Sequence, residues 1–180
     1  RNVNVTENAA VVTIGAINGG NRSNIIPEQV EMLGTVRTLS ESDEELIFKR
    51  IREIVTNTAE ANGAHAIVEL PYSSHYPVTF NDIELTKNMV PSLQKAAGSD
   101  HVNLIPAETG AEDFSFFANE VPGFYFYVGA LPKGQDPKTS ASHHTPDFFL
   151  DESGFITGVK AMLNLVSDYM ETSSVAYSKK

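Results

Sequence analysis

The strongest constraint on the fold is a pair of β-rich segments near the start of the chain, separated by a glycine-rich break. Residues 10–17 form a run rich in β-branched side chains, followed by Asn18-Gly19-Gly20-Asn21. Residues 29–39 alternate in side-chain character with the period of two that is typical of a half-buried sheet. We therefore expect two strands joined by a glycine-rich loop.

The segments that follow predict a mixed order of helices and strands. Ser42 with Glu45 has the spacing of a capping box, so a helix is expected to begin there and to end at Asn62-Gly63. Residues 66–70 alternate as a third strand. Asn81-Asp82 caps a further helix that Gly98 closes, and Pro91 within it predicts a kink or a division into two helices.

The later part of the chain is richer in aromatic residues. Short strands are expected at 102–105 and 123–129, and a turn leading into an aromatic helix at 110–119. Asp151-Glu152 is expected to open a last helix. Its predicted core face consists of Ile156, Val159, Leu163, Val166 and Met170. A boundary near Thr79 divides the chain into residues 1–79 and 80–180.

Composition excludes several classes of function. The 180 residues carry a formal charge of −10 and no concentrated basic patch, which argues against nucleic-acid or anionic-membrane partners. No apolar run approaches the roughly 20 residues that span a bilayer. Cysteine is absent, so any metal must be held by His, Asp or Glu.

Two segments contain candidate metal or acid–base residues. His143 and His144 lie in a loop before Pro146, and at most one of them is expected to bind a metal because neighbouring side chains diverge. The alternative is a solvent-exposed or hydrogen-bonding histidine. Glu112 lies in Gly-Ala-Glu-Asp-Phe, where a carboxylate can line a cleft. The alternative, which composition alone favours, is a helix N-terminus where an acidic residue has no further role.

The glycine-rich loop at 19–27 is the third candidate. As a phosphate loop it is weak, because it lacks the Lys-Ser/Thr ending and leads into a strand, so a nucleotide-binding domain remains only a minor alternative. Asn24 and Arg37 can instead bind a carboxylate, Arg37 through its bidentate fork. The alternative for Arg37 is a surface or ion-paired strand residue.

Taken together, six motifs in this order resemble a known family. They are Gly19-Gly20 with Asn24-Ile25-Ile26-Pro27; Gly34 to Thr38; Tyr76-Pro77 with Asn81-Asp82; Gly110 to Phe114; Pro122-Gly123; and His144-Thr145-Pro146 with Asp151-Glu152. Their order and spacing are similar to those of the co-catalytic metal-dependent amidohydrolases, which include hippurate hydrolase, the aminoacylases and the auxin-conjugate hydrolases.

The resemblance implies a fold and a site. It implies an α/β protein in which residues 1–79 form part of a ferredoxin-like α+β lid and 80–180 the C-terminal part of a zinc-peptidase-like catalytic domain. Two divalent metals are implied, commonly Zn²⁺, with Mn²⁺ or Co²⁺ as alternatives. His144 matches a metal ligand, while Asn24, Arg37 and Glu112 match substrate-binding positions. The implied reaction is hydrolysis of an N-acyl amino acid, and the implied assembly is a homodimer through the lid.

The departures from the family pattern limit what this chain is expected to do alone. The family's first metal ligands and its general-base Glu would all lie upstream of Arg1, as would the first strand and helix of the lid. We therefore expect the chain to be a C-terminal portion that contains no catalytic base, hydrolyses nothing alone and binds Zn²⁺ weakly. With its lid incomplete, it is expected to need the missing part or to oligomerise. The alternative is a non-catalytic dimerisation or interaction module derived from the same family.

Overall fold

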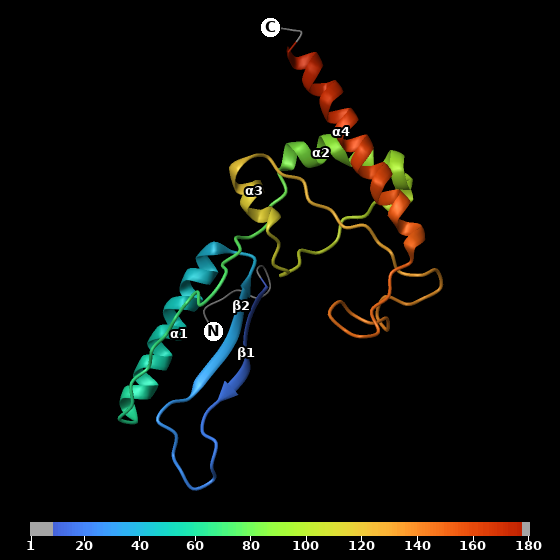
Figure 1. Ribbon diagram of the computed structural model, residues 1–180. Helices are drawn as coiled ribbons and strands as arrows, with labels where there is room; N and C mark the ends of the chain where they lie inside the picture. Colours follow the sequence, from blue (N-terminus) through green and yellow to red (C-terminus); the bar gives the residue numbers. More distant parts are fainter. Residues whose placement is uncertain (1–8, 178–180) are drawn as a thin grey trace. The chain divides into compact units, whose positions relative to one another are not determined.

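The protein is described by a computed structural model, which covers residues 9–177. The chain forms the elements β1, β2, α1, α2, η1, α3, η2 and α4 in sequence order (Figure 1). They group into two compact units. The first contains the chain up to Thr79 and the separate stretch Pro106–Phe117, and the second contains Phe80–Ile105 and the chain from Ala118 onward. The predicted mixed α/β class is confirmed.

The first unit is built on an antiparallel hairpin. Strands β1 (Ala10–Asn18) and β2 (Glu31–Thr38) pair from Ala10 opposite Thr38 to Asn18 opposite Glu31, with a bulge between Ile14 and Ala16. Gly34 is required by a close approach of the two backbones, because a Cβ placed there would lie 2.3 Å from the carbonyl oxygen of Thr13. Both predicted strands are confirmed, with ends shifted by one or two residues.

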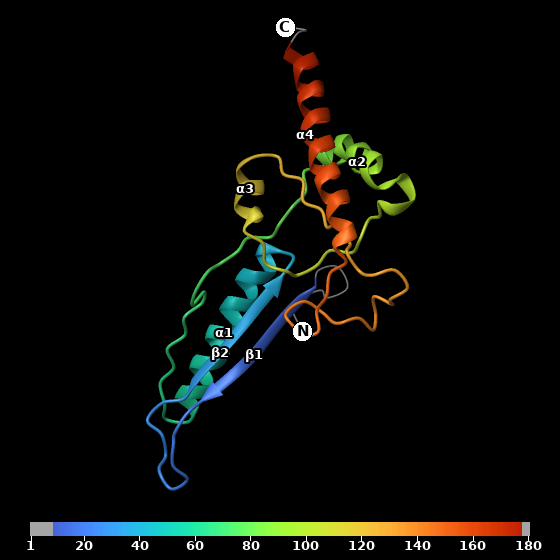
Figure 2. The same cartoon turned by 45° about the vertical axis from the view of Figure 1, so that its right-hand side comes forward.

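Helix α1 (Glu41–Ala61) follows the hairpin and lies along it in both views (Figures 1 and 2). Its N-cap is Ser40, whose hydroxyl accepts a hydrogen bond from the Asp43 amide. The predicted capping box at Ser42 is therefore wrong by two residues, because the helix begins earlier and the Ser42 hydroxyl pairs with that of Ser40. The predicted end is confirmed, since Gly63 has a positive φ of 71°.

The predicted strand at 66–70 is wrong as a strand. Its side chains alternate as expected, with Ala66, Val68 and Leu70 half-buried and Ile67 92% exposed. A strand also needs a neighbour to complete its backbone hydrogen bonds. The sheet that the structure describes contains β1 and β2 alone, so this segment stays extended and unpaired by a ladder. Arg52 of α1 donates to the Leu70 carbonyl oxygen at 2.6 Å.

The second unit contains two long helices. Helix α2 (Ile83–Ala97) is capped by Asp82, whose carboxylate accepts from the Leu85 amide, and it ends at Gly98. Of the kink or division predicted at Pro91, the division is wrong, because α2 continues through that residue as one helix. A short turn, η1 (Ser99–His101), follows α2. A second turn, η2 (Glu152–Gly154), leads directly into helix α4 (Phe155–Tyr177). Helix α3 (Phe114–Glu120) confirms the predicted aromatic helix.

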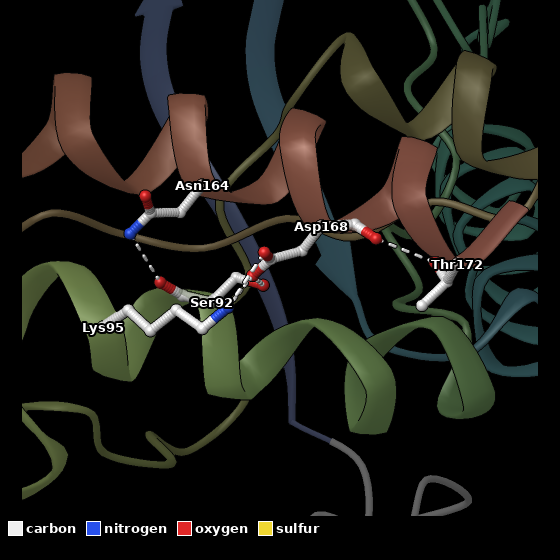
Figure 3. Close-up of polar contacts among 5 residues, drawn as sticks. All are labelled: Ser92, Lys95, Asn164, Asp168 and Thr172. Carbon is white, nitrogen blue, oxygen red and sulfur yellow. Dashed lines mark hydrogen bonds and ion pairs between the residues drawn. The ribbon is translucent and has the colours of Figure 1, made fainter. Parts of the chain in front are cut away.

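Helices α2 and α4 are joined by polar contacts (Figure 3). Asp168 of α4 accepts hydrogen bonds from the Ser92 hydroxyl at 2.5 Å and from Lys95 at 2.8 and 2.9 Å. Asn164 donates to the Ser92 carbonyl oxygen at 3.3 Å. Ser92 is 1% exposed, so its hydroxyl is buried with its partner in place. These bonds fix which side of α4 faces α2.

The predicted core face of α4 is wrong for this chain. The side of α4 that is buried carries Ala161, while the apolar residues predicted to form the core are all more than half exposed: Ile156, Val159, Leu163, Val166 and Met170. The spacing was that of an amphipathic helix, but α2 contacts the polar side. None of the helices within residues 9–177 combines the length and the apolar character that a membrane crossing requires.

The aromatic segment 123–129 differs from its prediction in the same way as segment 66–70. It was predicted as a strand and is not one among the described residues. Its rings alternate, with Phe124 5.8 Å from Phe126 and Tyr125 5.3 Å from Tyr127 between centroids. The Asn81 side chain accepts from the Tyr125 amide at 2.7 Å and donates to its carbonyl oxygen at 2.8 Å. One side-chain amide therefore takes the place of a neighbouring strand at one residue. The predicted strand at 102–105 is likewise not formed.

Candidate functional site

Asn24 lies in the loop that joins β1 to β2. The loop turns at Arg22, whose carbonyl oxygen accepts from the Ile25 amide, and Gly20 adopts a φ of 70° against Pro27. It encloses a shallow hollow of about 290 Å³, lined by Gly19, Gly20, Asn21, Arg22, Ser23, Ile25 and Pro27. Asn24 is exposed and is not among these lining residues. Its amide is therefore available to a ligand outside the hollow.

Arg37 lies near the other end of β2. Its Nη1 donates a hydrogen bond of 3.0 Å to the carbonyl oxygen of Thr109, 72 residues later in the chain. Arg37 is exposed, and a guanidinium has five N–H donors of which this bond uses one, so other donors can meet a ligand. The contact brings the end of β2 to the segment that carries Glu112.

Glu112 belongs to the same unit as Arg37 and lies just before α3, whose first residues, up to Phe117, are part of that unit. Its carbonyl oxygen accepts from the Ser115 hydroxyl at 2.6 Å and from the Ser115 amide at 3.2 Å. Ser115 is fully buried. The main chain at Glu112 is therefore held by the first turn of α3, and its side chain is half-buried. The location of Glu112 just before a helix is therefore compatible with a role beside a ligand.

The hairpin separates Asn24 from Arg37. Arg37 is six residues from the start of β2, which at about 3.3 Å per residue corresponds to about 20 Å, and Asn24 lies beyond that start in the loop. The structure thus brings Arg37 close to the Glu112 segment and leaves Asn24 in the loop at the opposite end of the hairpin. A single small substrate cannot touch Asn24 and Arg37 of one chain with the hairpin in this form.

His144 belongs to the second unit and has an unusual backbone. Its φ is 64°, a left-handed conformation that costs a non-glycine residue about 1–2 kcal/mol. The turn around it is closed by the Thr145 hydroxyl, which donates to the Ser142 carbonyl oxygen at 2.7 Å, and by the Phe148 amide, which donates to the Thr145 carbonyl oxygen at 3.2 Å. Such strain is concentrated at functional sites, which favours a role for His144.

The neighbouring His143 has a different environment. Its ring packs edge-on against Phe148 with centroids 4.8 Å apart. The rings of His143 and His144 are 6.4 Å apart and at 89° to each other. That at most one of the two histidines is a metal ligand stays a prediction.

The described residues do not fit a metal ion by themselves. No three His, Asp or Glu side chains gather around a common point within residues 9–177. A structural or catalytic zinc needs at least three protein ligands. His144 can therefore supply one ligand of a metal sphere at most.

Sequence reasoning did not identify the partner of Arg37. The acceptor is a main-chain carbonyl, and every residue has one, so no residue type marks Thr109 as the partner. The left-handed backbone of His144 was also not apparent, since glycine and asparagine are the usual signals for that conformation. For the contacts of Asp168 the sequence offers a weak indication: Ser92 and Lys95 are polar and lie three residues apart, on one face of the same helix.

Comparison with known proteins places these residues in a family. Residues 5–168 match peptidase family M20/M25/M40. The N-acetyldiaminopimelate deacetylase of Leuconostoc citreum is 33% identical over 163 residues, covering 91% of this chain and 40% of that protein. The chain thus spans about 40% of the length of such curated relatives.

Solved structures support the same family. A protein from methicillin-resistant Staphylococcus aureus has a TM-score of 0.72 and 29% identity, over 90% of this chain and 40% of that one. The YXEP protein of Bacillus subtilis, described as a dinuclear metal-binding peptidase of the M20 family, has a TM-score of 0.65 and 27% identity, over 89% of this chain and 42% of its own. Asn24, Arg37, Glu112 and His144 all fall within the matched residues 5–168.

Proposed function

The chain belongs to peptidase family M20/M25/M40, and from this membership we propose that it is part of a metal-dependent hydrolase that cleaves the amide bond of N-acyl amino acids. The observation that carries the proposal is the match to relatives named N-acetyldiaminopimelate deacetylase, at 31–33% identity over at least 91% of this chain. An N-acetylated amino acid is the substrate class that such a name describes. Substrates of the hippurate type share the same amide and free carboxylate.

The described residues support this substrate class by their chemistry. Arg37 binds the free carboxylate of the substrate through the donors that Thr109 leaves unused. Asn24 donates from its amide to an acyl carbonyl oxygen, and its distance from Arg37 is explained if it serves the site of a second copy. Glu112 lines the cleft beside Arg37. The catalytic base is not among these residues.

The proposed hydrolase also contains a metal site. His144 is one ligand, and the remaining ligands belong to parts of the hydrolase outside the described residues. A bound Zn²⁺, Mn²⁺ or Co²⁺ would polarise a carbonyl or activate water. The chain alone is expected to hold such an ion weakly, because one imidazole is a poor site.

The first unit also carries the proposed homodimer contact. Within the described residues β1 and β2 pair only with each other, so each strand has an unpaired edge that a second copy can extend. Their large apolar residues are exposed on both faces, with Val12, Ile14 and Met32 on one face and Val11 and Leu33 on the other. Pairing with a second copy through this lid-like unit would bury that surface. The net charge of −10 argues against nucleic acid and anionic membranes as partners.

The direct test measures hydrolysis and metal content together. Hippurate and N-acetyldiaminopimelate are offered to the 180-residue chain and to an intact hydrolase that contains it. We expect turnover by the intact protein alone, and His144→Ala in that protein is expected to abolish turnover and to lower the metal content. Retention of both in the variant removes His144 from the site. Absence of turnover in the intact protein favours the non-catalytic interaction module.

A further inference from the structure

The segment Pro106–Phe117 packs with the first unit although the chain on both sides of it belongs to the second. Two long-range contacts hold it there. Arg37 donates to the Thr109 carbonyl oxygen at 3.0 Å, and the ring of Phe116 lies 5.9 Å from that of Tyr76 between centroids. The Glu112 segment lies between these two anchors. Its placement therefore depends on the unit that contains the hairpin.

Arg37 can hold this segment and still bind a ligand. Its guanidinium has five N–H donors in one plane, and a bidentate carboxylate uses two of them. The carbonyl oxygen of Thr109 takes one from Nη1. Because the guanidinium is planar and rigid, a bond to one nitrogen also restricts where the remaining donors point.

We propose that Arg37 is a positioning residue for the segment that carries Glu112, in addition to being a binder of the substrate carboxylate. One side of its guanidinium fixes the Thr109 carbonyl, and the remaining donors meet the carboxylate of an N-acyl amino acid. Carboxylate binding and the position of Glu112 are then coupled through a single side chain. The identity of the ligand rests on the proposed function, whereas the hold on the segment does not.

The hold on the segment is tested without any ligand, by limited digestion of the 180-residue chain with a glutamate-specific protease. Glu108 and Glu112 are cleavage sites inside the segment, and Glu84 and Glu152 are reference sites in the second unit. Arg37→Met is expected to speed cleavage at Glu108 and Glu112 roughly five-fold, since a lost hydrogen bond of this kind favours local opening. The reference sites are expected to stay unchanged.

Two variants control this experiment. Thr109→Ala retains the main-chain acceptor and is expected to digest like the parent chain. Arg22→Met removes an arginine from the hairpin loop instead and is also expected to change nothing at Glu108 or Glu112. Equal digestion of Arg37→Met and the parent chain would overturn the proposal, because an arginine that only binds substrate has no effect in its absence.

The coupling is tested by steady-state kinetics of the intact hydrolase. Arg37→Met is expected to lower kcat about ten-fold as well as to raise KM, and Arg37→Lys, which retains a charge and donors, is expected to recover part of kcat. A rise in KM with unchanged kcat would overturn the coupling. If the intact protein hydrolyses no N-acyl amino acid, the proposed function fails, and digestion alone decides whether Arg37 holds the segment.

Discussion

The hairpin β1–β2 and the aromatic segment 123–129 have the same kind of alternating sequence and different structures. The strands of the hairpin are neighbours along the chain, and their backbones pair from Ala10–Thr38 to Asn18–Glu31. Segment 123–129 has its alternating rings in place but no partner strand within the described residues; the Asn81 side chain bonds its backbone at Tyr125 and the Asp82 amide bonds it at Gly123. Alternation therefore predicts which segments are suited to a sheet, whereas a strand forms only where a neighbour is available.

The largest expected effect tests the pairing in the hairpin. Gly34→Ala is expected to destabilise the first unit by about 2–3 kcal/mol, because the new Cβ meets the Thr13 carbonyl oxygen at 2.3 Å. Gly15→Ala is the matched control, since its Cβ would meet nothing nearer than 4.0 Å. Denaturant unfolding followed by circular dichroism measures both. Equal stability of the two variants would show that the strands are less tightly paired than described.

A smaller effect is expected where one side chain stands in for a strand. Asn81→Ala removes both bonds to the Tyr125 backbone and is expected to cost about 1–2 kcal/mol in the second unit. Near-ultraviolet circular dichroism should also lose tyrosine signal as the segment loosens. Asn88→Ala, on the exposed side of α2, is the control. An unaltered spectrum and stability would mean that the segment is held by other contacts.

The unpaired segment 66–70 offers a test of association. Ile67→Lys is expected to weaken self-association of the chain about ten-fold, because a charge on an unpaired strand-like segment opposes pairing with another copy. Leu104→Lys is the control, since Leu104 is fully exposed and lies in the second unit, outside the proposed dimer contact. Sedimentation velocity over a range of concentrations gives the constants. Equal weakening by both would indicate nonspecific hydrophobic contact.

The smallest expected effect concerns the contact between helices α2 and α4, which does not depend on strand pairing. Hydrogen bonds from Lys95 and then from Ser92 hold the pKa of Asp168 below its ordinary value. Because the folded pKa is depressed, this stabilisation is present above the unfolded pKa of about 3.9 and is lost as the pH falls through the folded value. Asp168→Asn should therefore reduce stability at pH 7 and less so below pH 3, measured by thermal unfolding. A pH-independent difference would contradict this account.

The sequence predicted which segments form helices and the hairpin better than it predicted which segments pack against one another. The hairpin and helices α1, α2 and α3 followed from local signals, such as Asp82 before α2 and Gly63 after α1, because caps and turns act within a few residues. The strands at 66–70 and 123–129 and the buried face of α4 did not, since each depends on a neighbour that local patterns do not specify. The same limit applies to the candidate site, where Arg37 was recognisable and its contact with Thr109 was not.

The chain passes between the two units at three places, after Thr79, after Ile105 and after Phe117. The hairpin unit is therefore not a contiguous piece of polypeptide. Excision at Thr79 would remove the carbonyl that Arg37 binds and the ring that Tyr76 contacts. Any transplant of this unit into another protein would have to carry residues 106–117 as well, and because Phe117 lies inside α3, the unit cannot be excised at that end without dividing a helix.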